Sequence, residues 1–149
     1  MSDGMSGHCL CGAVRFKAIP EKQEMGVCHC AMCRRWTGGT FMAVGCSQVD
    51  VEDDTEIGVY TSSDWGERGF CRKCGTTLFW RMRDGSHVSV AAQAFDDPGV
   101  FRFTSEIFVD EQPKNYAFKN ETTRMTGPEL IAMVTGKAEA SGKGEPGHG

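Results

Sequence analysis

The sequence predicts a mainly β domain that is held together by metal ions bound to cysteine. Apolar and polar residues alternate with the period of strands in several stretches, which are separated by glycine, proline and aspartate. Seven of the eight cysteines stand in closely spaced groups. The length of 149 residues fits one core, and metal ions would add stability because a domain of this size buries only about two-thirds of its unfolded surface.

The expected strands follow one another with short polar breaks. In CGAVRFKA, Val14 and Phe16 alternate with Arg15 and Lys17, as in a half-buried strand. The segment 65–82 predicts a hairpin with cysteines in its turn and β-branched and aromatic residues after it. Extended structure is also expected at residues 41–51, 57–63, 87–94 and 101–112.

One short helix is expected near the C-terminus, after Gly127. Pro128 suits the first helical position, and apolar residues follow it. From Gly136 onward the chain has almost nothing to bury. The sequence therefore predicts a single zinc-binding domain over residues 1–135 and a flexible tail over 136–149.

Charge and hydropathy limit the partners. The net charge of -4 comes from interspersed charges without long runs, so we expect no nucleic-acid partner. No apolar run approaches the roughly 20 residues of a membrane span, and the N-terminal residues do not resemble a signal peptide. We expect a soluble cytoplasmic protein with no membrane partner; the sequence leaves the oligomeric state unknown.

The expected compartment favours metal binding over disulfides. A reducing cytosol keeps thiols free, whereas a secreted disulfide scaffold is the alternative. The close cysteine spacing counts against that alternative.

Two cysteine pairs predict a closed zinc site. Cys9 and Cys11 would point to the same side of an extended strand, and Cys71 and Cys74, followed by Gly75, form a tight knuckle. Four thiolates about 2.3 Å from the ion suit zinc. Because this pairing closes a long loop, metal binding becomes folding free energy, and loss of Cys74 should unfold the domain.

The middle cluster, Cys28, Cys30 and Cys33, predicts an open zinc site where a strand enters a turn. Three protein ligands and a vacant position are typical of zinc sites that do chemistry. His29 should point away from the thiolates. The alternative is a second structural zinc completed by His29, by a partner chain or by Cys46, which is more typical of a small buried residue.

Three spaced motifs carry a resemblance to a known family. The motifs are Gly7-His8-Cys9-Leu10-Cys11-Gly12-Ala13-Val14-Arg15-Phe16, Cys28-His29-Cys30-Ala31-Met32-Cys33-Arg34 with Gly38, and Phe70-Cys71-Arg72-Lys73-Cys74-Gly75-Thr76. With them the chain resembles the glutathione-dependent formaldehyde-activating enzyme family, which includes centromere protein V. The resemblance covers about residues 7–120, including Ile107-Phe108-Val109-Asp110 and Pro113-x-x-Tyr116.

The resemblance implies a fold, two metals and a reaction. It implies a β-tent fold of antiparallel sheets, a structural zinc at Cys9, Cys11, Cys71 and Cys74, and a labile catalytic zinc at Cys28, Cys30 and Cys33. The family reaction condenses formaldehyde with glutathione to S-hydroxymethylglutathione and is classed as a carbon-sulfur lyase. The implied partner is a small-molecule thiol such as glutathione.

The sequence also contains residues that could bind a substrate, and it leaves two alternative functions open. The open position would take a thiol, because three thiolates weaken zinc as a Lewis acid. Aromatic residues that could form a pocket wall are Trp36, Phe41, Trp65 and Phe70, and arginines that could bind a carboxylate are Arg34, Arg35 and Arg68. The alternative functions are a non-catalytic zinc-binding module and a thiol sensor.

Overall fold

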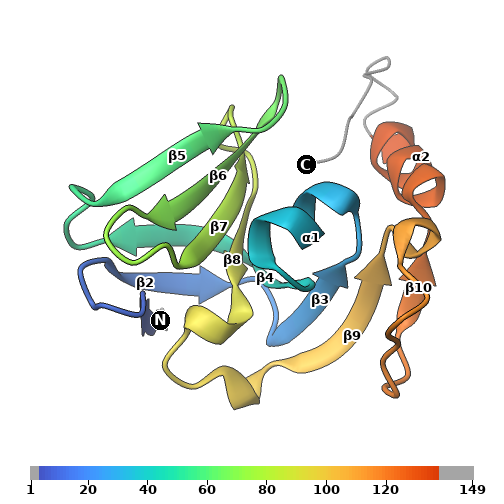
Figure 1. Ribbon diagram of the computed structural model, residues 1–149, viewed down its shortest axis with the longest axis horizontal. Helices are drawn as coiled ribbons and strands as arrows, with labels where there is room; N and C mark the ends of the chain where they lie inside the picture. Colours follow the sequence, from blue (N-terminus) through green and yellow to red (C-terminus); the bar gives the residue numbers. More distant parts are fainter. Residues whose placement is uncertain (1–3, 138–149) are drawn as a thin grey trace.

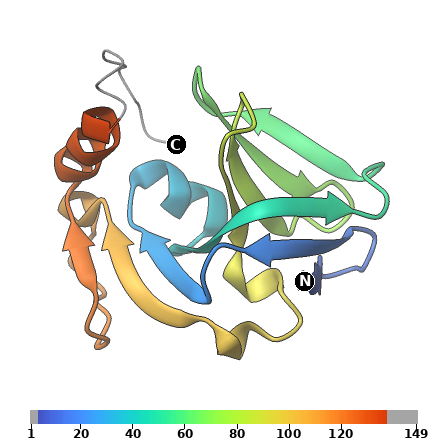
Figure 2. The same ribbon diagram turned by 180° about the vertical axis from the view of Figure 1, so that it is seen from behind.

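The computed structural model describes residues 4–137, which form one mixed sheet of ten strands and two helices (Figures 1 and 2). The strands are β1 (Met5–His8), β2 (Arg15–Pro20), β3 (Glu24–Cys28), β4 (Phe41–Val51), β5 (Ile57–Thr61), β6 (Gly66–Cys71), β7 (Thr77–Met82), β8 (Val88–Ala91), β9 (Arg102–Ile107) and β10 (Thr123–Met125). The helices are α1 (Ala31–Thr37) and α2 (Gly127–Lys137), and short 3-10 turns lie at Ala92–Ala94, Pro98–Val100 and Val109–Glu111.

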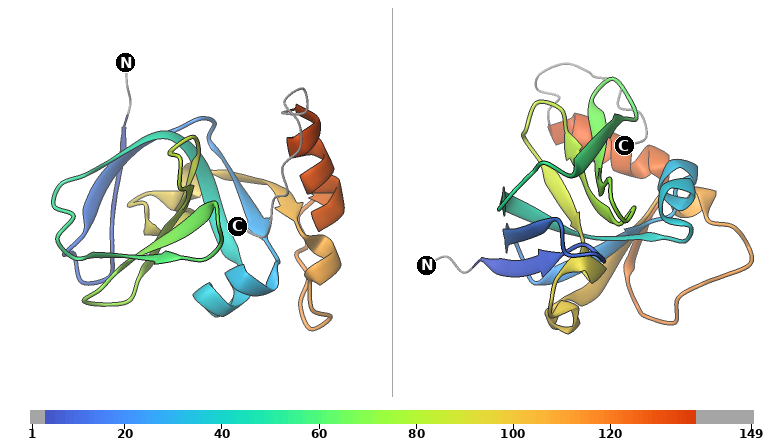
Figure 3. Two further views of the ribbon diagram at one scale, coloured as in Figure 1. Left: turned by 90° about the horizontal axis from the view of Figure 1, so that it is seen from above. Right: turned by 60° about the vertical axis from the view of Figure 1, so that its left-hand side comes forward.

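Strand β4 joins the two halves of the sheet. The main strand order is β10-β9-β3-β4-β8-β7-β6-β5, and β2 pairs with both β1 and β4. Alternate residues of β4 face opposite sides: Val44 and Cys46 pack in the larger core, whereas Phe41 and Ala43 belong to a second apolar cluster beside α1. Figure 3 shows α2 at the margin of the molecule, beyond β9 and on the far side from β5 and β6.

The expected mainly β architecture is confirmed, with two additions. Most strand pairs are antiparallel, but β9 pairs in parallel with both β3 and β10. Helix α1, which is seven residues long, was not predicted from the sequence. The expected C-terminal helix runs to Lys137, and the rest of the predicted tail lies outside the described residues. None of the helices within residues 4–137 has the length and apolar character that a membrane crossing requires.

Candidate functional site

The four-cysteine cluster, Cys9, Cys11, Cys71 and Cys74, is assembled from two turns. Every pair of Sγ atoms in it lies within 4.8 Å, with 3.7 Å between Cys9 and Cys11 and 3.9 Å between Cys11 and Cys71. Sulfurs about 2.3 Å from a central zinc in tetrahedral array are about 3.8 Å apart, so this cluster fits the ion. Within it Cys9 and Cys71 are buried, and Cys11 is exposed.

Backbone contacts hold these two turns in place. The Cys9 Sγ accepts a hydrogen bond from the Val14 amide at 3.3 Å, and the Leu10 amide donates to the Thr76 hydroxyl at 2.9 Å, which ties one turn to the other. Gly75, with φ of 82°, takes a left-handed conformation that a side chain would strain. The Thr76 hydroxyl is the main cause that lowers the pKa of Cys74 to about 5.

The local geometry predicted for Cys9 and Cys11 was wrong. Cys9 and Cys11 do not share the face of a strand, because β1 ends at His8 and β2 begins at Arg15. The sulfurs meet because the chain turns between them, and the Gly12 amide donates to the Cys9 carbonyl at 3.1 Å. The predicted grouping of the residues holds for a different local reason.

The three-cysteine cluster, Cys28, Cys30 and Cys33, lies where β3 passes into α1. Cys28 is the last residue of β3, Cys30 caps the N-terminus of α1, and Cys33 lies in its first turn with its amide 3.4 Å from the Cys30 Sγ. Their Sγ atoms all lie within 4.8 Å of one another. Within residues 4–137 no fourth cysteine, histidine or carboxylate joins this group. Its donor set fits a soft divalent cation with one position left open.

Electrostatics explain why this group favours a cation. Hydrogen bonding to Cys30 and Cys33, burial and repulsion between thiolates raise the pKa of Cys28 well above its ordinary value. For Cys33, the hydrogen bond with Cys28 lowers the pKa, but the Cys30 thiol and burial outweigh it and bring the pKa to about 11. Three thiolates in this space therefore need positive charge nearby.

Arg68 supplies part of that positive charge. Its side chain is only 2% exposed, its Nη1 lies 3.5 Å from the Cys33 Sγ, and its guanidinium lies over the Trp36 ring at 4.8 Å. Arg68 was one of the arginines expected to bind a carboxylate, but in the structure it lies against a sulfur atom. A guanidinium here offsets the excess negative charge that three thiolates give to a divalent ion.

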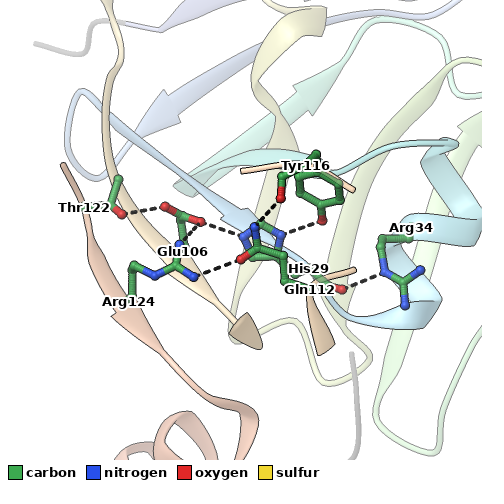
Figure 4. Close-up of polar contacts among 7 residues, drawn as sticks. All are labelled: His29, Arg34, Glu106, Gln112, Tyr116, Thr122 and Arg124. Atoms are coloured by element: carbon green, nitrogen blue, oxygen red, sulfur yellow. Dashed lines mark hydrogen bonds and ion pairs between the residues drawn. The ribbon is translucent and has the colours of Figure 1, made fainter. Parts of the chain in front are cut away.

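His29 points into a buried polar network (Figure 4), and its ring nitrogens do not belong to the three-cysteine group. Its side chain is fully buried, and its two ring nitrogens lie 2.7 Å from Glu106 Oε1 and 2.6 Å from the Tyr116 hydroxyl. An ionised Glu106 accepts from Nε2–H, so in the neutral ring Nδ1 accepts from Tyr116. Both nitrogens are therefore engaged, which excludes His29 as the fourth metal ligand in this conformation.

Glu106 is the centre of this network. Besides His29, it accepts hydrogen bonds from the Thr122 hydroxyl at 2.6 Å and from Arg124 Nη1 at 2.7 Å. Burial opposes its ionisation, but these hydrogen bonds and the charge of Arg124 hold the pKa of Glu106 below its ordinary value. The network connects the segment between two cysteines of the three-cysteine cluster to β9 and β10 (Figure 4).

A cleft of about 920 Å³ opens beside the three-cysteine cluster. Cys28 and Cys33 line one end of it, and His87 and Glu21 lie among the residues that line the rest. Phe108, at its margin, has a positive φ of 58°, an uncommon conformation for an aromatic residue that places strain beside the site. The arrangement can hold a ligand whose one end reaches the cysteines.

The other candidate side chains divide between the cleft and the core. Of the four aromatic residues expected at a pocket wall, Phe41 and Trp65 line the cleft, whereas Trp36 packs against Phe41 with ring centroids 5.0 Å apart. Phe70 does not line it and lies against Gly58. Three further residues are accounted for elsewhere: Arg34 donates to the His29 carbonyl at 2.9 Å, Arg35 is exposed, and Cys46 is buried with its thiol 3.4 Å from the Val44 carbonyl.

Comparison with known proteins identifies the class to which this fold and these clusters belong. Residues 4–111 match the family model of the glutathione-dependent formaldehyde-activating enzyme, which is more than half of the chain. The chain therefore belongs to this family.

Two relatives and one solved structure are similar to the chain. An uncharacterized lyase of Schizosaccharomyces pombe is 35% identical over 130 residues, covering 86% of this chain and 95% of the relative. A putative glutathione-dependent formaldehyde-activating enzyme of Halomonas elongata is 31% identical over 85 residues, covering 50% of this chain and 54% of that protein. A crystal structure of a Rhodobacter sphaeroides protein shares the fold, with a TM-score of 0.55 and 24% identity over 67% of this chain and all of that one.

Several residues of the site were not found from the sequence. Glu106 and Arg124 belong to no sequence motif, and no sequence pattern placed His87 near the cysteines. Tyr116 did carry a signal, because it belongs to the Pro113-x-x-Tyr116 pattern of the family resemblance. Its contact with His29 spans 87 residues, which local pattern reasoning does not reach.

Proposed function

We propose that this protein is a zinc-dependent carbon-sulfur lyase-type enzyme acting on a thiol adduct, such as S-hydroxymethylglutathione formed from glutathione and formaldehyde. The observation that carries the proposal is the three-cysteine cluster, which has no fourth protein ligand within residues 4–137 and borders a cleft through Cys28 and Cys33. Family membership and the names of the relatives support the same reaction class.

The two cysteine clusters take different roles in this proposal. Cys9, Cys11, Cys71 and Cys74 hold a structural zinc, because four thiolates leave no position for a substrate. Cys28, Cys30 and Cys33 would hold the catalytic zinc, which would lower the pKa of a substrate thiol and leave more easily than the structural ion. The same cysteines require a reducing compartment, so we place the protein in the cytoplasm.

The bonding changes of the condensation are simple. The substrate sulfur forms a bond to the carbonyl carbon of formaldehyde, the C=O π pair moves to oxygen, and the proton lost by the thiol ends on that oxygen. The reverse reaction breaks the carbon-sulfur bond. Cys28 and Cys33 define the end of the cleft at which the sulfur is delivered, and Arg68, 3.5 Å from Cys33, balances the charge of the thiolates.

Metal content and thiol binding test the proposal together. We expect two zinc ions per native chain, one in Cys30→Ser, and loss of glutathione-adduct or thiol binding with the second ion. Cys46→Ser is the matched control, since Cys46 is buried outside both clusters, and it should keep both ions. If Cys30→Ser keeps two zinc ions, the open site is wrong.

Rate measurements test the named reaction separately. The zinc-loaded protein should accelerate condensation of formaldehyde with a thiol above the uncatalysed rate, and Cys30→Ser should not. A native protein that gives only the uncatalysed rate with every thiol tested would remove the enzymatic assignment while leaving the metal sites intact.

A further inference from the structure

The floor of the cleft is hollow because small residues share one face of the central strands. These residues are Gly26 of β3, Ala43 and Gly45 of β4, Ser89 of β8 and Ser105 of β9. Val27, Val44 and Val90, one position along each of three strands, are buried. The register pairs Gly26 with both Ala43 and Ser105, and Gly45 with Ser89, so the small residues lie side by side.

The walls of the cleft are apolar on both sides. One wall comes from the β6–β7 hairpin: Trp80 and Met82 lie in β7, and Trp65 directly precedes β6. The indole rings of Trp65 and Trp80 meet edge to face, with 5.9 Å between their centroids. On α2, Leu130, Ile131 and Val134 line the cleft as well. Because α2 begins at Gly127, this part of the wall lies outside the residues 4–111 that match the family. The lining of the cleft therefore includes residues beyond the segment that matches the family model.

Charged groups in the cleft do not suit a substrate with carboxylates. Lys22 is the one lysine or arginine among the described lining residues, whereas Glu21 and Glu24 are both present. Glu24 is paired with Arg102 at 3.1 Å. Glu21 and His87 lie together near Gly45, where an added Cβ would be 3.2 Å from the Glu21 carboxylate and 3.5 Å from the His87 ring.

The arginines that could have received a carboxylate are used elsewhere. None of Arg34, Arg35 and Arg68 lines the cleft. Arg34 donates to the His29 carbonyl, and Arg68 is buried against Cys33 and Trp36. A glutathione molecule, with two carboxylates and one ammonium group, would bring net negative charge into a space where Glu24 is already paired with Arg102, Glu21 is a further carboxylate and the exposed Lys22 is the one lysine or arginine among the described lining residues, which disfavours its binding.

We propose that the cleft selects a thiol with an apolar body and no carboxylate, with its sulfur at Cys28 and Cys33 and its body between the two tryptophans and α2. The inference rests on the proposed function, because it names the substrate class of the same site. From Phe41 to Gly45 the β4 floor is about 13 Å long, enough for an aromatic or branched aliphatic group beyond the sulfur. Apolar burial, not ion pairing, provides the affinity.

Tryptophan fluorescence measures occupancy directly, because Trp65 and Trp80 line the cleft. The zinc-loaded full chain is titrated with 2-phenylethanethiol, with glutathione and with the thiol-free 2-phenylethanol. We expect 2-phenylethanethiol to bind at least tenfold more tightly than glutathione. Glutathione binding as tightly as 2-phenylethanethiol, or more tightly, would overturn the inference.

Two substitutions on α2 provide a matched pair. Val134 lines the cleft and is 48% exposed, whereas Met133 is 45% exposed and does not line it. Val134→Glu should weaken 2-phenylethanethiol binding about tenfold, and Met133→Glu should leave it unchanged. Equal weakening in both variants, or no change in either, contradicts the assignment of the wall to α2.

The thiol-free probe separates this inference from the proposed function. If Cys30→Ser keeps two zinc ions but 2-phenylethanol still binds and responds only to Val134→Glu, the proposed function fails and the apolar preference of the cleft stands. If Cys30→Ser loses one ion but the native protein prefers glutathione, the proposed function stands and the preference for an apolar thiol fails.

Discussion

The two cysteine clusters differ in what surrounds them more than in what they contain. The four-cysteine cluster joins two turns, includes the exposed Cys11 and is supported by backbone amides and the Thr76 hydroxyl. The three-cysteine cluster joins a strand to a helix, borders a cleft and has a buried histidine between its first two cysteines. We therefore expect protein stability to depend on the four-cysteine cluster and ligand binding to depend on the three-cysteine cluster.

The largest effect is expected from removing one thiolate of the four-cysteine cluster. The Cys71→Ser variant should be unfolded at 25 °C even when zinc is supplied, because structural zinc binding contributes on the order of 10 kcal/mol to folding. Circular dichroism and zinc content measure the effect. Cys30→Ser should stay folded under the same conditions, and equal loss of structure in both variants would abolish the distinction between the clusters.

The buried network behind the three-cysteine cluster gives the next largest effect. Glu106→Gln leaves His29 and Arg124 without their carboxylate, so we expect the free energy of unfolding to fall by about 3 kcal/mol. Urea unfolding provides the measurement. Glu121→Gln, at an exposed position, is the control and should change it by less than about 0.5 kcal/mol. If Glu106→Gln has the same free energy of unfolding as the native protein, the network does not contribute to stability.

The pH dependence of stability tests the ionised state of Glu106. Because its folded pKa lies below the ordinary value of 4.5, Glu106 contributes stability above about pH 4.5, and this contribution is lost as the pH falls through the folded pKa. The difference in unfolding free energy between the native protein and Glu106→Gln should therefore narrow as pH falls from 6 to 3. A gap that stays constant would mean that the pKa of Glu106 does not differ between the folded and unfolded states, which contradicts the lowered pKa.

The smallest effect is expected from the charge beside Cys33. Arg68→Gln removes the guanidinium 3.5 Å from the Cys33 Sγ, so zinc affinity at the three-cysteine cluster should fall about tenfold. Competition with a chromophoric chelator measures the affinity of each ion. Arg35→Gln, on the exposed face of α1, should leave both affinities unchanged, and the four-cysteine cluster should be unaffected in both variants.

Cysteine spacing and strand periodicity predicted much of this molecule because both are local signals. The strand at residues 41–51 coincides with β4, and the residues of both cysteine clusters do meet in space. Helix α1 was missed because its seven residues are too few to display an apolar period. The predicted zinc ions and their structural and catalytic roles remain predictions.

The network around His29 was beyond such reasoning because its contacts are distant in sequence. His29 meets Glu106 across 77 residues and Tyr116 across 87. The parallel pairing of β3 with β9 creates these contacts, since it brings Val27 beside Glu106 and Cys28 beside Ile107. The local sequence around a polar residue of a strand, such as Glu106 of β9, does not show whether its side chain is buried with a partner or exposed to solvent.

The position of Thr122 and Arg124 determines how far the chain can be shortened from its C-terminus without disrupting the fold. Both residues follow the segment that matches the family, yet they supply donors to Glu106, which is only 1% exposed. A chain that ended at residue 111 would keep all the cysteines. It would lose Thr122 and Arg124, which donate to the Glu106 carboxylate, and Tyr116, which contacts the His29 ring. The segment that matches the family model is therefore shorter than the folded unit, and a truncated or grafted version of this protein should extend beyond α2.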